Sequence, residues 1–118
     1  NYNVMGIAKA ALETSVKYLA VDLGDKKIRV NGISLGPMRT LSGAAIKDSR
    51  YIYNWTEKNN PLGKKIDFND LSGASNYLLS NQSSGVTGEI HYVDAGYNVI
   101  GMIKPPKKAW KVSLTNII

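Results

Sequence analysis

The sequence contains no cysteine and only one histidine, His91, and these absences exclude several kinds of site. Without cysteine the chain can form neither a disulfide framework nor a thiolate metal site. A single histidine cannot build a histidine metal cluster, so we expect no bound metal. No apolar run approaches the roughly 20 residues of a membrane-spanning helix, and no signal peptide is recognisable. We therefore expect a cytoplasmic protein that makes no membrane contact.

The composition is that of one globular domain: 118 residues, of which 43% are hydrophobic and 20% charged. Fifteen basic residues against nine acidic ones give a formal net charge of +6, which favours acidic partners. This charge leaves open a non-catalytic module that binds nucleic acid or an anionic surface. The lysines that would support it cluster in residues 104–118, where no periodicity is found. We interpret this segment as a tail and expect no nucleic-acid partner.

The hydrophobic pattern predicts alternating helices and strands. The segments are a helix over 3–23, a strand over 27–35, a helix over 44–58, a helix over 67–79 and a strand over 88–96. Gly24 stands where a left-handed residue would end the first helix, and Gly36 with Pro37 breaks the first strand. Asp67 and Asp70 offer N-cap oxygens to the helix that follows them.

The order helix, strand, helix, helix, strand predicts an α/β layer with parallel strands, because parallel strands are joined by helical crossovers. Two strands alone make an incomplete sheet, since each parallel strand needs neighbours on both sides and cover on both faces. We therefore expect residues 1–103 to form part of a larger α/β domain, with residues 104–118 as its tail.

The second predicted strand contains the single histidine and leads into a turn. We expect His91 to be packed or to lie at the sheet edge rather than to act as a catalytic base. The turn is expected to be shaped by Asp94, Gly96 and Tyr97.

A tyrosine and a lysine stand seven positions apart at the start of the chain. Seven residues of α-helix turn the chain by about 700°, within about 20° of two full turns, so Tyr2 and Lys9 share one face. A tyrosine hydroxyl beside an ammonium group can donate a hydrogen bond to a developing oxyanion. The same spacing also occurs in helices without a site, so the pair points to chemistry only together with its surroundings.

Three blocks supply those surroundings: "YNVMGIAKAALE", "IRVNGISLGPMRT" and "SSGVTGEIHYVDAGY". In order and spacing they resemble the C-terminal part of bacterial NADH-dependent enoyl-acyl carrier protein reductases, a branch of the short-chain dehydrogenase/reductase superfamily. The resemblance extends from Asn1 to about Met102. Ordinary short-chain reductases place the lysine four residues after the tyrosine, where this chain has Gly6. The resemblance implies the last two strands and flanking helices of a Rossmann-like, doubly wound parallel sheet whose N-terminal half is absent.

The resemblance also implies a reaction and a cofactor. NADH would reduce a trans-2-enoyl thioester on acyl carrier protein during type II fatty acid elongation. Tyr2 matches the tyrosine that hydrogen-bonds the enolate, and Lys9 matches the lysine that holds the nicotinamide ribose. The Met38 backbone would contact the carboxamide and the Thr40 hydroxyl the pyrophosphate. The implied cofactor-binding residues are Lys9, Gly36, Pro37, Met38 and Thr40.

Further positions match the substrate and carrier sites of the family. Together with Tyr2, the matching pocket residues are Met5, Ser42 and Ile46. Lys47 and Arg50 match basic residues that meet the acidic carrier protein, although a solvated helix face explains such charges equally well. Leu35 replaces the usual alanine before the glycine of the turn. The family assembles as a homotetramer, so we expect the same assembly here.

No G-x-G-x-x-G occurs in the sequence, so these residues lack the usual turn that binds the adenosine half of a dinucleotide. We expect them to work only with a missing N-terminal half of the same domain and to be inactive alone. Two alternatives stay open: another short-chain reductase, such as a 3-ketoacyl type, and the basic binding module described above.

Overall fold

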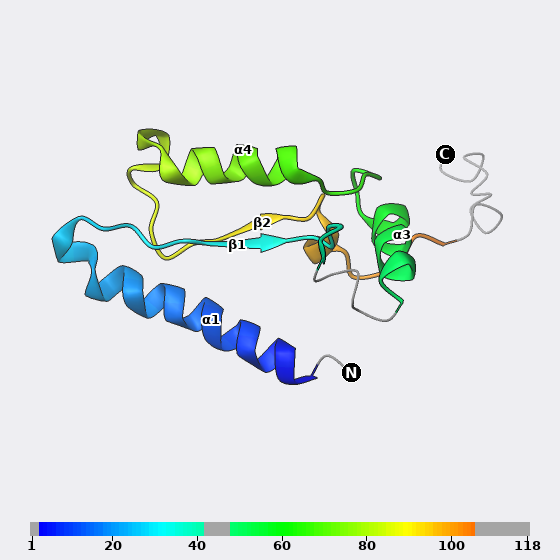
Figure 1. Cartoon of the computed structure of the whole chain (residues 1–118), viewed down its shortest axis with the longest axis horizontal. Helices are drawn as coiled ribbons and strands as arrows, with labels where there is room; N and C mark the ends of the chain where they lie inside the picture. Colours follow the sequence, from blue (N-terminus) through cyan, green and yellow to red (C-terminus); the bar gives the residue numbers. More distant parts are fainter. Residues whose placement is uncertain (1–2, 42–47, 106–118) are drawn as a thin grey trace, which may run out of the picture.

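The computed structural model describes residues 3–41 and 48–105, which are arranged in three layers (Figure 1). A two-stranded sheet lies between helix α1 (Asn3–Asp22) on one face and helix α4 (Phe68–Leu79) on the other. Helix α3 (Ser49–Asn59) lies beyond the carboxyl ends of the strands. This end of the sheet is where ligands bind in open α/β folds.

The strands β1 (Gly32–Leu35) and β2 (Ile90–Val93) are parallel, with Ile33 opposite His91. The chain between them contains α3 and α4, which confirms the prediction of parallel strands joined through helices. β1 begins five residues later than predicted. The reason is that the preceding segment bonds to side chains and loops: Val30 N donates to Thr87 Oγ1 at 3.1 Å, and the Arg29 guanidinium donates to Ser83 Oγ at 2.9 Å.

Local sequence signals predict the start of α4 correctly but the end of α1 incorrectly. The prediction that Gly24 is the left-handed residue is wrong: a 3₁₀ turn (Gly24–Lys26) continues α1, and Lys27 takes the left-handed conformation with φ 59°. The predicted N-cap of α4 is confirmed. The Asp67 carboxylate accepts hydrogen bonds from Asn69 N and Asp70 N, and the Asp70 carboxylate accepts one from Asp67 N.

Asp70 also accepts a hydrogen bond of 2.6 Å from Lys64 Nζ. This bond, helped by the backbone bond from Asp67, holds the pKa of Asp70 below its ordinary value of 3.8. Because the folded-state pKa is the lower one, the carboxylate's contribution to stability is complete above pH 3.8 and is lost as the pH falls through the folded-state pKa. We expect the free energy of unfolding of Asp70→Asn to fall less than that of the wild type as the pH is lowered through the acid range.

The measurement is the free energy of unfolding of the full-length protein in urea across the acid range. Asp48→Asn serves as the matched control, because the Asp48 side chain makes no cap hydrogen bond at the start of α3. Parallel curves for the wild type and Asp70→Asn would contradict the expectation.

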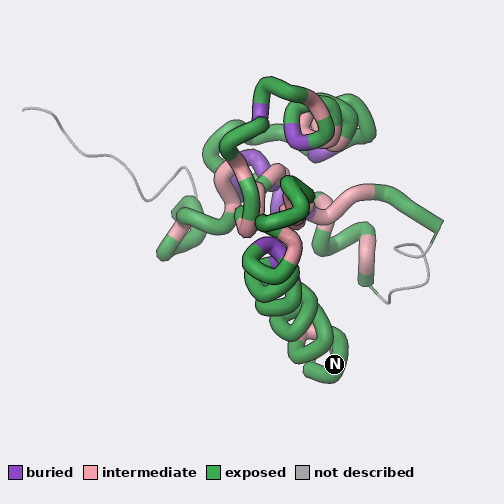
Figure 2. Tube along the Cα trace, turned by 90° about the vertical axis from the view of Figure 1, so that its left-hand side faces the viewer, coloured by how far each residue is buried: buried purple, intermediate pink, exposed green. Residues whose placement is uncertain are grey.

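The core is small. The buried apolar residues are Val16, Ala20, Ile66, Leu78 and Ala95. Figure 2 shows that the buried stretches are short and that most of α1 is exposed. Val4, Ile7 and Val21 of α1 are 84%, 73% and 79% exposed, so two strands leave much of its apolar surface uncovered. In the described part of the chain, no helix has the length and hydropathy needed to cross a membrane.

Candidate functional site

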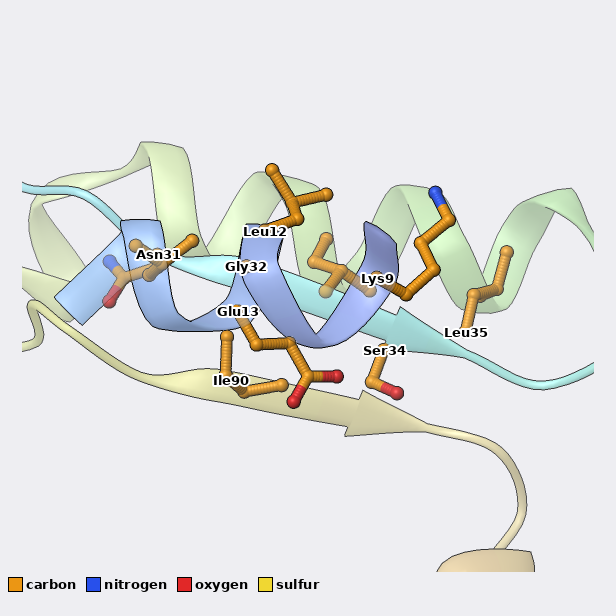
Figure 3. Close-up of a pocket in the computed structure, with 10 residues that line it drawn as sticks. Lys9, Leu12, Glu13, Asn31, Gly32, Ser34, Leu35 and Ile90 are labelled. Atoms are coloured by element: carbon orange, nitrogen blue, oxygen red, sulfur yellow. The ribbon is translucent and has the colours of Figure 1, made fainter. Parts of the chain in front are cut away.

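A pocket of about 520 Å³ lies between α1 and the sheet (Figure 3). Lys9, Leu12 and Glu13 line it from α1, and the residues of β1 form its other wall. Figure 3 shows the Lys9 and Glu13 side chains leaving the helix in different directions. Leu35 lines the same pocket as Lys9. The structure thus places the predicted lysine beside the end of β1, directly before the predicted cofactor turn.

The turn after β1 is closely packed at its first residue. Gly36 is buried, and its N–H donates to Val93 O at 2.9 Å, which extends the ladder by one bond. A Cβ atom at this position would lie 3.1 Å from both Asp94 Cα and Ile66 Cγ1. A side chain at this position would therefore force the two neighbouring segments apart by a few tenths of an ångström. The following residues, Pro37 and Met38, line a second pocket of about 310 Å³.

A third pocket, of about 270 Å³, lies between the end of this turn and the start of α3. Arg39 and Thr40 line it from the turn, and Ser49, Arg50 and Tyr53 line it from the helix. Two guanidinium groups and several hydroxyls suit it to an anionic group. Predicted cofactor residue Thr40 and predicted carrier-contact residue Arg50 therefore share one pocket.

The predicted site residues are brought together only in part. Thr40 is grouped with Arg50, and Pro37 with Met38, while Lys9 lines a different pocket. Met5 is 50% exposed on α1, one turn before Lys9. Four predicted residues lie outside the described residues: Tyr2, Ser42, Ile46 and Lys47.

The turn after β2 is more elaborate than its sequence indicates. Asp94 is only 9% exposed, and its carboxylate accepts hydrogen bonds from Gly96 N at 2.9 Å and Asn98 N at 2.8 Å. The Asn98 side-chain amide lies 3.1 and 3.0 Å from the two carboxylate oxygens. Ala95 and Gly96 are both left-handed, with φ 57° and 83°. The predicted turn is confirmed. The only sequence signal that Asp94 lies at its centre is the spacing of an aspartate two residues before a glycine.

His91 does not join the candidate site. Its Nδ1 lies 2.9 Å from Glu89 Oε1, and its ring is tilted against that of Tyr77 with centroids 6.1 Å apart. This confirms the prediction that His91 is packed or lies at the sheet edge. Within residues 3–41 and 48–105, no three histidine or acidic side chains group as metal ligands would.

Known proteins resemble this chain in both sequence and structure. The family model described as enoyl-(acyl carrier protein) reductase matches residues 1–98. The enoyl-[acyl-carrier-protein] reductase [NADH] 2 of Rhizobium meliloti is 56% identical over 113 residues, which cover 96% of this chain and 41% of that protein. The corresponding reductase of Rickettsia typhi is 56% identical over 88% of this chain and 40% of its own length. The chain thus spans about 40% of the length of these relatives.

Solved structures give the same result. The crystal structure of the Anaplasma phagocytophilum enoyl reductase in complex with NAD has a TM-score of 0.82 and 55% identity, covering 88% of this chain and 40% of that one. The Plasmodium berghei enoyl reductase with triclosan has a TM-score of 0.83 and 41% identity, covering 86% and 36%. These matches confirm the predicted α/β class, a portion of a Rossmann-like fold. The chain therefore belongs to the enoyl-(acyl carrier protein) reductase family, within the short-chain dehydrogenase/reductase superfamily.

Proposed function

We propose that the protein containing these residues uses NADH to reduce trans-2-enoyl-acyl carrier protein to acyl-acyl carrier protein in fatty acid elongation. The observation that supports this most is the agreement between the described fold and a reductase crystallised with NAD, at a TM-score of 0.82 and 55% identity. The seven-residue spacing of Tyr2 and Lys9 agrees with the same reaction.

The donors of the site fit NADH by their chemistry. Lys9 lines a pocket along a parallel strand, and its ammonium would donate to ribose hydroxyls there. The pocket shared by Arg39, Thr40 and Arg50 offers cationic and hydroxyl donors that suit a pyrophosphate. The close packing at Gly36 fixes the start of the turn whose backbone, at Met38, would bind the carboxamide. When bound, NADH supplies the hydride.

Tyr2 stabilises the charge that develops during the reaction. Reduction at the β-carbon of the enoyl thioester moves negative charge onto the thioester oxygen, and the Tyr2 hydroxyl donates a hydrogen bond there. This interaction strengthens as the charge grows, so it lowers the barrier rather than tightening substrate binding. Lys9 keeps the cofactor aligned. The positive charge of its ammonium also favours the negative charge that develops on the thioester oxygen.

The proposal includes the remaining contacts and the assembly. Met5, Ser42 and Ile46 line the acyl pocket, and Lys47 and Arg50 attract the acidic carrier protein, an effect that added salt weakens. The protein works as a cytoplasmic homotetramer, and residues 1–103 belong to one domain. Lys104, the first residue of the proposed tail, still contacts the domain, because its N–H donates to Asn59 Oδ1 and its Nζ to Asn60 O.

The test is NADH oxidation by the full-length protein with crotonyl and acetoacetyl thioesters side by side. We expect oxidation with the crotonyl thioester only. Oxidation with the acetoacetyl thioester only would favour the 3-ketoacyl alternative. With neither thioester active, a salt-sensitive DNA shift that survives removal of residues 104–118 would favour the basic module. As the control, the 118 residues alone are expected to leave NADH unoxidised, because they contain no G-x-G-x-x-G.

A further inference from the structure

We propose that Asp94 is a positioning residue that holds the cofactor turn (residues 36–40) and helix α3 in a fixed relation to each other. The inference rests on the proposed function, which assigns cofactor contacts to the turn and carrier contacts to α3. Asp94 touches neither ligand in this scheme. It acts through two sets of contacts, one made by its backbone and one by its side chain.

The backbone of Asp94 forms the wall behind the cofactor turn. A Cβ atom on Gly36 would lie 3.1 Å from Asp94 Cα and 3.3 Å from Asp94 Cβ, so these two segments of the chain are already in close contact. The hydrogen bond from Gly36 N to Val93 O, 2.9 Å long, prevents the turn from moving away. The position of Asp94 therefore determines where the backbone of the turn begins.

The side chain of Asp94 stabilises an unfavourable backbone conformation next to that wall. Ala95 has φ 57°, a left-handed conformation that is unfavourable for a residue with a Cβ atom. The Asp94 carboxylate offsets this cost by accepting from Gly96 N and Asn98 N, while Tyr97 N donates to Asp94 O at 3.1 Å. Ionised acceptors make stronger hydrogen bonds than neutral ones. Without the carboxylate, the left-handed pair, Ala95 and Gly96, loses the hydrogen bonds that stabilise its conformation.

The left-handed pair supports the end of α3. Leu62 N donates to Ala95 O at 3.3 Å, and a Cβ atom on Gly96 would lie 2.9 Å from Pro61 Cγ. Pro61 follows Asn60, which is 1% exposed and whose side chain bonds Lys64 at both its N–H and C=O. The turn after α3 is therefore stiff, and a shift of the pair moves the helix. Figure 1 shows the segment after β2 between the strand ends and α3.

The test is Asp94→Asn in the full-length protein, measured as kcat, the KM for NADH and the KM for crotonyl thioester carried on acyl carrier protein. Asparagine has the same size but loses one acceptor. We expect both KM values to rise together, by about 3- to 10-fold each. We also expect kcat/KM for each substrate to fall by about 10- to 100-fold, because small misplacements of reacting groups slow the reaction strongly. Asp25→Asn is the charge-matched control, because Asp25 lies exposed in the 3₁₀ turn after α1.

A residue that only stabilises the fold would lower Tm and leave both KM values of the folded enzyme unchanged, and that result would overturn the inference. A rise in one KM alone would also overturn it, because the coupling would be absent. If Asp94→Asn does not fold, Asn98→Ala decides, since it removes only the side-chain amide and should raise both KM values by a smaller factor. A wild type that oxidises no NADH with the thioester refutes the proposed function instead.

Discussion

Replacing Tyr2 with phenylalanine in the full-length protein is expected to lower kcat for crotonyl thioester by about 10²- to 10³-fold, as loss of one oxyanion donor does elsewhere. The KM for NADH should change little, because the ring is kept and Lys9 is proposed to hold the ribose. The measurement is steady-state NADH oxidation at saturating cofactor.

Tyr18→Phe is the matched control for this experiment. Tyr18 lies on α1 and is 70% exposed, so removal of its hydroxyl should leave kcat unchanged. If Tyr2→Phe retained the wild-type kcat, the hydroxyl would have no part in the reaction, and the assignment of the oxyanion donor would be wrong.

The second large effect is on stability. Gly96→Ala is expected to lower the free energy of unfolding by roughly 2–5 kcal/mol, because two costs add. A left-handed residue with a Cβ atom costs about 1–2 kcal/mol, and overpacking costs about 1–3 kcal/mol. The overpacking arises because the new methyl group would lie 2.9 Å from Pro61 Cγ. Urea unfolding of the full-length protein measures the loss.

Two other glycines separate these costs. Gly63 also has a positive φ, 63°, but a Cβ atom there would meet nothing within 4 Å, so Gly63→Ala should cost only the roughly 1–2 kcal/mol of the backbone conformation. Gly73, in the middle of α4, is equally unobstructed and should gain about 1 kcal/mol as alanine. Equal losses at Gly96 and Gly63 would refute the proposed contact with Pro61.

The parts of the fold that could be predicted depend on residues close together in sequence. Asp67 and Asp70 are three residues apart, so their capping box could be predicted from spacing. The break after β1 could be predicted from Gly36 and Pro37. The start of β1 could not, because the segment before it bonds to residues more than 50 positions away, among them Ser83, whose side chain is fully buried.

The candidate site divides in the same way. Lys9 and the turn after β1 were predicted as site residues from three sequence blocks, and the structure puts Lys9 in a pocket along the strand that leads to the turn. The role of Asp94 could not be assigned, because it depends on Gly36 and Pro61, which approach from other parts of the chain. Spacing along the sequence contains no information about such approaches until the fold is known.

The parallel pairing of β1 and β2 also sets an order of events during synthesis. Ile33 pairs with His91, so β1 is made almost sixty residues before its partner strand. At about 5 to 20 residues per second, this interval lasts about 3 to 12 s. During that time the edge of β1 that β2 later covers has no partner strand from this pair and can join a strand of another nascent chain. Slower translation of the segment between the strands would lengthen this exposure and so increase misassembly on polysomes.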